Sequence, residues 1–309
     1  MRSTRDGFNG YAADISGVQG LAMIVTKLKH AVLSCMSLDI EGAPNVERLR
    51  DVYRAWCAAV PFDNVRKMVA LRTGANHLPG IDAQDFFEAW LTHGTGATCW
   101  PGSNALHAIL EADGFDVRRA TGSMRDVGVE NHGTLIVHID RSTWLVDSSM
   151  LLGDPVELRD HTYRRDDRYG TEVEVSDRSH VVWYQVPPHN TGFPCRLLRR
   201  DVDESVFRAR YVESRDRSPF NARLYARRNT RYGTVVIRGS TRFERDGSGE
   251  VREVVLDRQG ILDALARDIG ISPPMVDAWI ACGALDASLQ PYAGPPPPPI
   301  ATVPPSRRA

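Results

Sequence analysis

Residues 132–147 read HGTLIVHIDRSTWLVD, and the fold of the chain depends on the hairpin that they predict. Apolar runs stand on both sides of the polar dipeptide Asp140-Arg141, a pattern that predicts two antiparallel strands joined by a tight turn. A two-residue turn at this dipeptide pairs Thr134 with Asp147. His132 then lies diagonally opposite Asp147 on the same face, about 7–8 Å away and within reach of a side-chain hydrogen bond. A slip of one residue would put the two on opposite faces, so this pair depends on the register.

Outward from the hairpin, the spacing of apolar residues separates helices from strands. Helical spacing predicts helices at residues 20–36, 46–59, 83–93, from just after Cys99 to Gly114, 260–269 and 274–284. Alternation predicts strands at residues 115–121, 133–139, 143–148, 180–186, 222–228, 233–238 and 251–256. Helices followed by strands and then by helices predict an α+β fold with a mostly antiparallel sheet. The last stretch, GPPPPPIATVPPSRRA at residues 294–309, predicts a disordered or polyproline-like tail.

The composition is that of a globular chain without a charge bias. Hydrophobic residues make up 42% of the 309 residues and the formal net charge is -1, so we expect no nucleic-acid and no membrane partner. The five cysteines are widely spread and form no CxxC pair, which argues against disulfides and a cysteine zinc site. No metal-ligand spacing such as HExxH occurs, and no run of 18 apolar residues exists. Charges interrupt residues 20–36, unlike a signal peptide. We therefore expect no metal and a cytoplasmic location.

Cys99 is the strongest candidate nucleophile. It stands in HGTGATCWP, residues 93–101, where glycines precede it and a predicted helix follows. The unpaired N–H groups and the dipole of a helix N-terminus favour thiolate over thiol, and the thiolate is the reactive form. A lone cysteine is more often a buried structural residue, which is our interpretation of Cys35, Cys57 and Cys282. The glycine-rich, helix-opening context separates Cys99 from them.

Three residues together predict cysteine-based catalysis. A cysteine nucleophile needs an imidazole to accept its proton, and that imidazole needs an acceptor on its other nitrogen to set its tautomer. His132 and Asp147, at the two ends of the hairpin, are placed to supply both. Separately, His132 would be a surface histidine at a strand end and Asp147 a turn residue. Together with Cys99 they predict a Cys-His-Asp triad.

A basic stretch lies further along the chain. Residues 196–231 carry eleven arginines against five acidic residues. The ordinary interpretation is a solvated face. The sharper one is a phosphate-binding surface for a phosphorylated carrier such as coenzyme A.

These elements make the chain resemble the arylamine N-acetyltransferase family over residues 38–275. That family has a Cys-His-Asp triad in this order on a transglutaminase-like core. Its cysteine opens a helix after a glycine-rich turn, and its aspartate ends a strand in an LVD motif, here residues 145–147. Residues 61–64, Pro-Phe-Asp-Asn, look like the family's Pro-Phe-Glu-Asn element, and residues 218–221, Ser-Pro-Phe-Asn, look like its C-terminal segment.

The resemblance implies an N-terminal helical bundle, a central antiparallel β-rich domain and a C-terminal α/β lid. The boundaries that we expect are an N-terminal extension at 1–37, a helical domain with the nucleophile at 38–114, a β-rich domain with the histidine and the aspartate at 115–215, the lid at 216–293 and the tail at 294–309.

The resemblance also implies a reaction. It would be ping-pong acyl transfer, in which Cys99 takes an acyl group from a thioester, usually acetyl-CoA, and passes it to a small-molecule amine. The acyl thioester would be a co-substrate, and no cofactor would be tightly bound. By the same resemblance, the residues that line the substrate site would be Phe62, Trp100, Ser148 and Phe220.

Three departures from the family's pattern surround the nucleophile and the aspartate. Thr95 stands where the family has the arginine of Arg-Gly-Gly. Trp100-Pro101 follow the nucleophile where the family has Phe-Glu, and residues 148–150, Ser-Ser-Met, replace a Gly-Phe-Gly-like stretch. The triad itself is intact. Because the changed residues flank the donor in the family, we expect altered selectivity for the acyl group.

Other functions are compatible with the same residues. Relatives of the family act as amide synthases, which release or cyclise an acyl chain held on a carrier protein, and the altered donor side favours this alternative. A hydrolase or transglutaminase-like enzyme would use the same triad on a peptide. A non-catalytic interaction module would instead use the proline-rich tail to bind SH3-like partners, but the intact triad argues against it.

Overall fold

The structure is a computed structural model that describes residues 28–38, 43–176, 180–189, 191–291 and 298–300. Most of the expected N-terminal extension and most of the proline-rich tail therefore lie outside the described residues. Of the helix expected at residues 20–36, only the part from residue 28 is described, and residues 28–35 are helical.

Three helices surround the candidate nucleophile, and their bounds follow the apolar spacing of the sequence. They are α2 (Val46–Ala59), α4 (Ala83–His93) and α5 (Cys99–Ala112). Asn45 and Asp82 cap the first two, because their side-chain oxygens accept backbone N–H groups of the first helical turn. The expected ends of α2 and α4 are confirmed to the residue.

An eight-stranded antiparallel sheet carries the hairpin. Its order is β5-β4-β3-β2-β9-β8-β7-β6. The strands are β2 (Asp116–Met124), β3 (His132–Ile139), β4 (Ser142–Val146), β5 (Val156–Glu157), β6 (Tyr163–Asp166), β7 (Thr171–Val175), β8 (Val181–Gln185) and β9 (Phe193–Val202). β3 and β4 pair from Ile139 opposite Ser142 to Leu135 opposite Val146. The register expected from the turn at Asp140-Arg141 is therefore confirmed.

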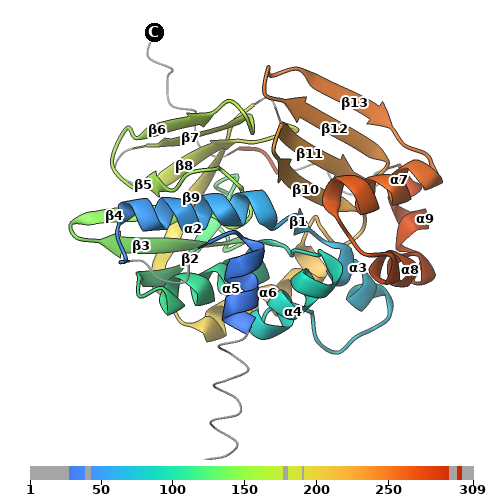
Figure 1. The fold of residues 1–309 in the computed structure, drawn as a ribbon, viewed down its shortest axis with the longest axis horizontal. Coiled ribbons are helices and arrows are strands. Elements are labelled where there is room, and N and C mark those ends of the chain that lie inside the picture. Colours follow the sequence, from blue (N-terminus) through green and yellow to red (C-terminus); the bar gives the residue numbers. More distant parts are fainter. Residues whose placement is uncertain (1–27, 39–42, 177–179, 190, 292–297, 301–309) are drawn as a thin grey trace, which may run out of the picture.

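A second, five-stranded antiparallel sheet stands beside the first (Figure 1). Its strands, in order, are β1 (Phe62–Asp63), β10 (Tyr225–Thr230), β11 (Gly233–Arg238), β12 (Thr241–Asp246) and β13 (Val251–Val255). The helices packed with it are α3 (Val65–Arg72), α7 (Arg258–Ala264), which continues as a π-helical turn (Leu265–Ile269), α8 (Pro273–Ala281) and α9 (Ala284–Leu289). The mixed helix and sheet content of the expected α+β class is confirmed.

Two large apolar cores hold these layers together, and a smaller apolar cluster contains Cys99, Trp100 and Tyr211. The larger one joins α2, α4 and α5 to the eight-stranded sheet and contains Trp56, Leu106 and Leu135. The second joins α3 to the C-terminal sheet and helices, with Met68 and Trp279 at its centre. The segment expected as one helical domain, residues 38–114, thus contributes to both cores. Residues 38–114, which include Cys99, are therefore packed against both sheets.

Several elements were not expected from the sequence. They are the helices α3, α6 (Glu204–Arg217) and α9 and the strands β1, β5, β6, β7, β9 and β12. Helix α6 buries only Phe207 and Tyr211 and is otherwise polar, so it shows little apolar periodicity. The strands missed in this way are rich in charged residues, because they lie at sheet edges or have one solvated face. Within the described residues, no helix combines the length and the apolar character needed to cross a bilayer.

Candidate active site

A tight turn presents Cys99 at the start of α5. The helix begins at Cys99 itself, with Thr98 before it in extended conformation as the N-cap. Asp63 holds the turn, because its Oδ2 accepts the N–H of Gly96 over 2.5 Å. A Cβ atom on Gly96 would lie 1.7 Å from the carbonyl oxygen of Pro61, so only glycine allows this approach. The motif at residues 61–64 therefore supports the nucleophile's turn.

His132 and Asp147 meet across the hairpin. His132 Nε2 lies 2.7 Å from Asp147 Oδ2. A carboxylate only accepts hydrogen bonds, so Nε2 carries the proton and donates it. The other ring nitrogen, Nδ1, is then the one available to Cys99, whose side chain interacts with His132 closely enough to raise the pKa of the imidazole. The structure thus brings the three expected residues together.

Neighbouring residues hold the Asp147 carboxylate in place. Its Oδ1 accepts the N–H of Ser149 at 3.0 Å, the Ser149 hydroxyl at 2.8 Å and the N–H of Met150 at 3.0 Å. Tyr184 donates to Oδ2 at 3.4 Å, and Tyr53 donates to the Asp147 carbonyl at 2.7 Å. These turn bonds explain why β4 ends at Val146, two residues before the end that the sequence predicts at residue 148.

A glycine lies opposite His132 on the neighbouring strand. Gly122 on β2 pairs with His132 on β3. A Cβ atom at Gly122 would lie 3.7 Å from His132 Cδ2 and only 2.6 Å from the sulfur of Cys195. A larger residue at this position would therefore collide with Cys195 on β9, the strand on the other side of β2 from the histidine.

The pair is charged at neutral pH. Burial by itself lowers the pKa of His132, but the charge and hydrogen bond of Asp147, together with the interaction with Cys99, raise it to about 10. Burial by itself raises the pKa of Asp147, but the charge and hydrogen bond of His132 and the hydrogen bonds from Ser149 lower it to about 2. An imidazolium of this kind stabilises a thiolate beside it.

Selective alkylation tests this arrangement. We expect iodoacetamide at pH 6 to label Cys99 first, because the adjacent imidazolium favours the thiolate. Burial raises the pKa of Cys57 to about 12 and also raises that of Cys195, so both stay protonated. The interpretation of Cys35 and Cys282 as buried residues is wrong, because Cys35 is exposed and Cys282 is only partly buried. Cys35 is therefore the matched control, since ordinary thiols react mainly near about pH 8.5. Peptide mapping after limited labelling is the measurement, and first labelling at Cys35 or Cys282 would contradict the activated thiolate.

Two of the four residues expected to line the substrate site lie together. The rings of Phe62 and Phe220 are 5.1 Å apart edge to face, and both also contact the ring of Tyr225. Asn64 joins their motifs, because its Nδ2 donates to the carbonyls of Phe220 at 2.8 Å and Arg223 at 2.7 Å. Its Oδ1 accepts the N–H of Tyr225 at 2.9 Å. The 61–64 and 218–221 motifs are therefore one structural unit.

The other two, Trp100 and Ser148, are buried apart from this aromatic cluster. Trp100 is 3% exposed, stacks edge to face on Phe207 with ring centroids 5.1 Å apart, and covers Gly133. The hydroxyl of Ser148 lies 2.8 Å from that of Ser103. Both support the backbone next to the triad, and their contact with substrate stays a prediction.

Arginines of the 196–231 stretch form ion pairs within the chain. Arg196 binds both carboxylate oxygens of Asp126. Arg199 and Arg210 converge on Glu130, whose pKa falls to about 2 because these guanidinium groups hydrogen-bond to it. These contacts favour a structural surface over a phosphate-binding one.

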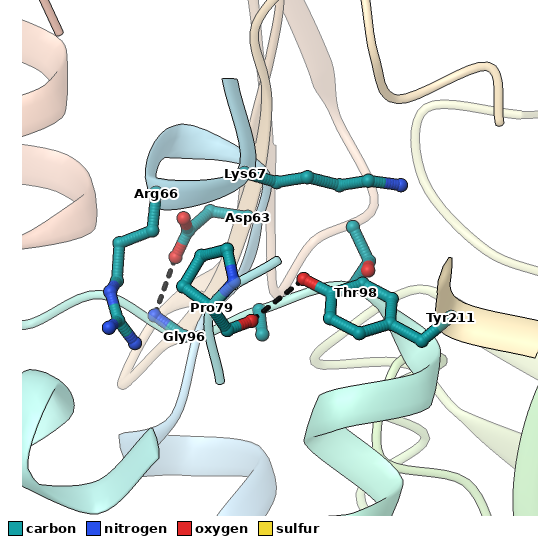
Figure 2. Close-up of a pocket in the computed structure, with 8 residues that line it drawn as sticks. Asp63, Arg66, Lys67, Pro79, Gly96, Thr98 and Tyr211 are labelled. Atoms are coloured by element: carbon teal, nitrogen blue, oxygen red, sulfur yellow. Dashed lines mark hydrogen bonds between the residues drawn. The ribbon is translucent and has the colours of Figure 1, made fainter. Parts of the chain in front are cut away.

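A small pocket lies against the nucleophile's turn (Figure 2). It has room for about one water molecule. The residues that line it are Asp63, Arg66, Lys67, Pro79, Gly96, Ala97, Thr98 and Tyr211. The hydroxyl of Thr98 is buried there and has no hydrogen-bond partner among the described residues.

Sequence reasoning missed several residues that shape the site. Tyr53 lies in the helix predicted at residues 46–59, and its hydroxyl donates to the carbonyl of Asp147. Tyr184 and Lys67 were not singled out at all. Only Asp63 carried a signal, through its place in the motif at residues 61–64. Within the part of the chain that the structure describes, no three His, Cys, Asp or Glu side chains are grouped to hold a metal ion.

Comparison with known families agrees with this geometry. A family model described as N-acetyltransferase matches residues 45–275, which include Cys99, His132 and Asp147. No curated protein matches the chain in sequence.

Solved structures share the fold. A variant of the arylamine N-acetyltransferase of Mycobacterium smegmatis superposes with a TM-score of 0.71 at 18% identity, covering 84% of this chain and 98% of that one. The Mycobacterium marinum enzyme in complex with CoA gives a TM-score of 0.70 at 18% identity, covering 84% and 97%. The Salmonella typhimurium enzyme gives 0.68 at 19% identity, covering 82% and 98%.

Proposed function

Because this chain belongs to the arylamine N-acetyltransferase family, we propose that it moves an acyl group from an acyl-CoA thioester through Cys99 to a small-molecule amine. The chain is an N-acyltransferase. The main support for the proposal is the position of the His132–Asp147 pair beside Cys99 at the first turn of α5.

The first half-reaction loads the enzyme. The Cys99 thiolate attacks the thioester carbonyl, the bond between carbonyl carbon and CoA sulfur breaks, and the departing sulfur takes the proton from His132. Asp147 keeps the imidazole oriented with Nδ1 toward the sulfur throughout. The product is a thioester on Cys99 and free CoA.

The second half-reaction releases the acyl group. The amine attacks the Cys99 thioester, His132 Nδ1 accepts a proton from the amine nitrogen, and the bond between carbonyl carbon and Cys99 sulfur breaks. The products are the amide and the Cys99 thiolate paired with the imidazolium. The aromatic cluster of Phe62, Phe220 and Tyr225 is the surface that we assign to an aromatic acceptor.

The donor need not be acetyl-CoA. Trp100 and Ser148 replace residues that flank the donor in the family, and both are packed tightly next to the triad. A changed lining shifts selectivity through contacts made in the transition state. We therefore expect acetyl-CoA to load Cys99 slowly and a longer acyl thioester to load it faster.

Intact-protein mass spectrometry over time tests the donor, with acetyl-CoA, longer acyl-CoA and carrier-linked thioesters in parallel. Cys99→Ser is the control that should give no adduct. Fast, stoichiometric acetylation with no gain from longer donors would restore plain acetyl transfer. Faster loading from the carrier-linked donor would favour the second candidate, an amide synthase acting on a carrier-bound chain. No adduct from any thioester, with Cys99 reduced, would count against acyl transfer.

A further inference from the structure

A buried lysine lies next to the nucleophile's turn. The chain has only three lysines against 35 arginines. Lys67, on α3, is 3% exposed and lines the pocket that also contains Ala97 and Thr98, the two residues before Cys99. Lysine differs from arginine in carrying a compact charge whose protonation can change when it is buried. Lysine is thus rare in this chain, and one of its three lysines lies next to the turn that carries the proposed nucleophile.

The ammonium group of Lys67 is held without a carboxylate partner. Its Nζ donates to the hydroxyl of Ser214 at 2.8 Å and to the Ser214 carbonyl at 3.4 Å, and it lies 5.5 Å from the ring centroid of Tyr211. Among the described residues, no Asp or Glu forms an ion pair with it. Asp63 lines the same pocket, but its carboxylate accepts the N–H groups of Gly96 and Val65. Figure 2 shows Lys67 extended past Asp63 toward the side of Thr98 and Tyr211.

Among the described charged groups around Lys67, only Cys99 favours its protonated form. From α3 and α6 the neighbours are cationic, namely Arg66 and Arg215. Burial lowers the pKa of Lys67, the charge of Cys99 raises it and the charge of Arg215 lowers it, and together they place this pKa at about 8. Tyr211, over which the ammonium lies, packs in the same apolar cluster as Cys99 and Trp100. Lys67 therefore lies against the residues that precede Cys99, and the charge of Cys99 is the one that raises the pKa of this lysine.

We propose that Lys67 is a positioning residue whose buried ammonium serves, with His132, as a counter-charge to the Cys99 thiolate. The inference rests on the proposed role of Cys99 as nucleophile. In a site of low polarity, an opposite charge nearby favours the ionised form of its partner. Loading the acyl group neutralises the sulfur and leaves the ammonium without its counter-charge. Lys67 therefore favours the free thiolate over the loaded enzyme and acts on the pH dependence of loading.

Stability separates this role from a structural one. A buried charge without a carboxylate costs free energy, and apolar replacements of similar volume are often neutral or stabilising. Lys67→Met should therefore keep or raise the melting temperature. A lysine kept for packing alone would show the opposite, a loss of stability with unchanged chemistry.

The experiment is the pH dependence of Cys99 alkylation and of acyl loading, read by intact mass, for the wild type and four variants. Lys67→Met and Lys67→Gln remove the charge, Lys67→Arg keeps it, and Lys29→Met is the matched control on a lysine that pairs with Asp113 elsewhere. We expect the alkylation midpoint to rise by about one pH unit in Lys67→Met and Lys67→Gln. Loading at pH 6.5 should fall about tenfold and recover at high pH. Lys67→Arg and Lys29→Met should keep the wild-type midpoint.

The outcomes distinguish the role of Lys67 from the proposed function of Cys99. An unchanged midpoint in either folded neutral variant overturns the role of Lys67, whereas the proposed function stands. An equal loss of rate at every pH would also overturn it, because a packing defect does not move a midpoint. Failure of the wild type to load at Cys99 would instead overturn the proposed function. If Lys67→Met does not fold, Lys67→Gln, which keeps a hydrogen-bond donor for Ser214, carries the test.

Discussion

Cys99→Ser is expected to lower kcat/KM for acyl transfer by at least ~10³-fold, because triad members act as a unit. A hydroxyl is far less acidic than a thiol, so the same imidazole cannot produce a competent nucleophile from it. The substitution replaces one small side chain by another at the start of α5, so the fold should persist. Steady-state kinetics with the best donor measure kcat/KM, and thermal unfolding measures whether the fold persists.

Cys35→Ser is the matched control for this substitution. Cys35 is exposed, so the same chemical change there should leave both activity and melting temperature unchanged. Substantial turnover by a folded Cys99→Ser protein would remove Cys99 as the nucleophile. Equal losses in both serine variants would point to a general effect on the protein.

Asp147→Asn is expected to lower kcat by roughly 10³- to 10⁴-fold. The asparagine oxygen can keep the bonds from Ser149 and Met150, which leaves its NH₂ group facing His132 Nε2. Nε2 must then accept, so the proton moves to Nδ1, where it blocks transfer from the Cys99 sulfur. The amide also cannot stabilise an imidazolium. The pH–rate profile of the variant should therefore change along with its rate.

Asp140→Asn is the control for the aspartate. Asp140 is exposed at the tip of the same hairpin with a φ of 53°, a left-handed conformation that asparagine tolerates. Its substitution should leave the rate unchanged. A near-normal rate in Asp147→Asn would mean that another residue orients His132.

The same pair contributes a pH-dependent part of the stability. His132 has a folded pKa raised from 6.5 to about 10, so its contribution is complete below about 6.5 and is lost as pH rises through 10. Asp147 has a folded pKa lowered from 3.8 to about 2, so its contribution is complete above about 3.8 and is lost as pH falls through 2. The stability difference between the wild type and Asp147→Asn should therefore be largest between about pH 4 and 6.5. Chemical unfolding across this range measures it.

The helices around the nucleophile and the register of the hairpin could be predicted because their causes are local. Asn45 and Asp82 cap helices whose apolar residues recur at helical spacing. The dipeptide Asp140-Arg141 sets the turn, and the turn sets which residues face each other. A short-range pattern is sufficient for such elements, so the placement of His132 relative to Asp147 could be read from the hairpin alone.

Helix α6 could not be predicted from the sequence, and therefore the residues that surround Lys67 could not be predicted either. Its two buried residues, Phe207 and Tyr211, are too few to show a period among many arginines. The partner of Lys67, Ser214, is 147 positions away in the chain. The contact between them depends on how α3 packs against α6, for which no local pattern exists.

The sequence by itself determined the α+β class, the order of the triad residues and the family to which they belong, since each depends on periodicity, turn residues and motif spacing. Only the tertiary structure decided what surrounds them. The carboxylate of Asp63 holds the turn before Cys99, Tyr53 and Tyr184 hold Asp147, and a lysine rather than an arginine lies buried against that turn. The physical reason is that burial and charge act through space, between side chains that the fold brings together from distant parts of the chain.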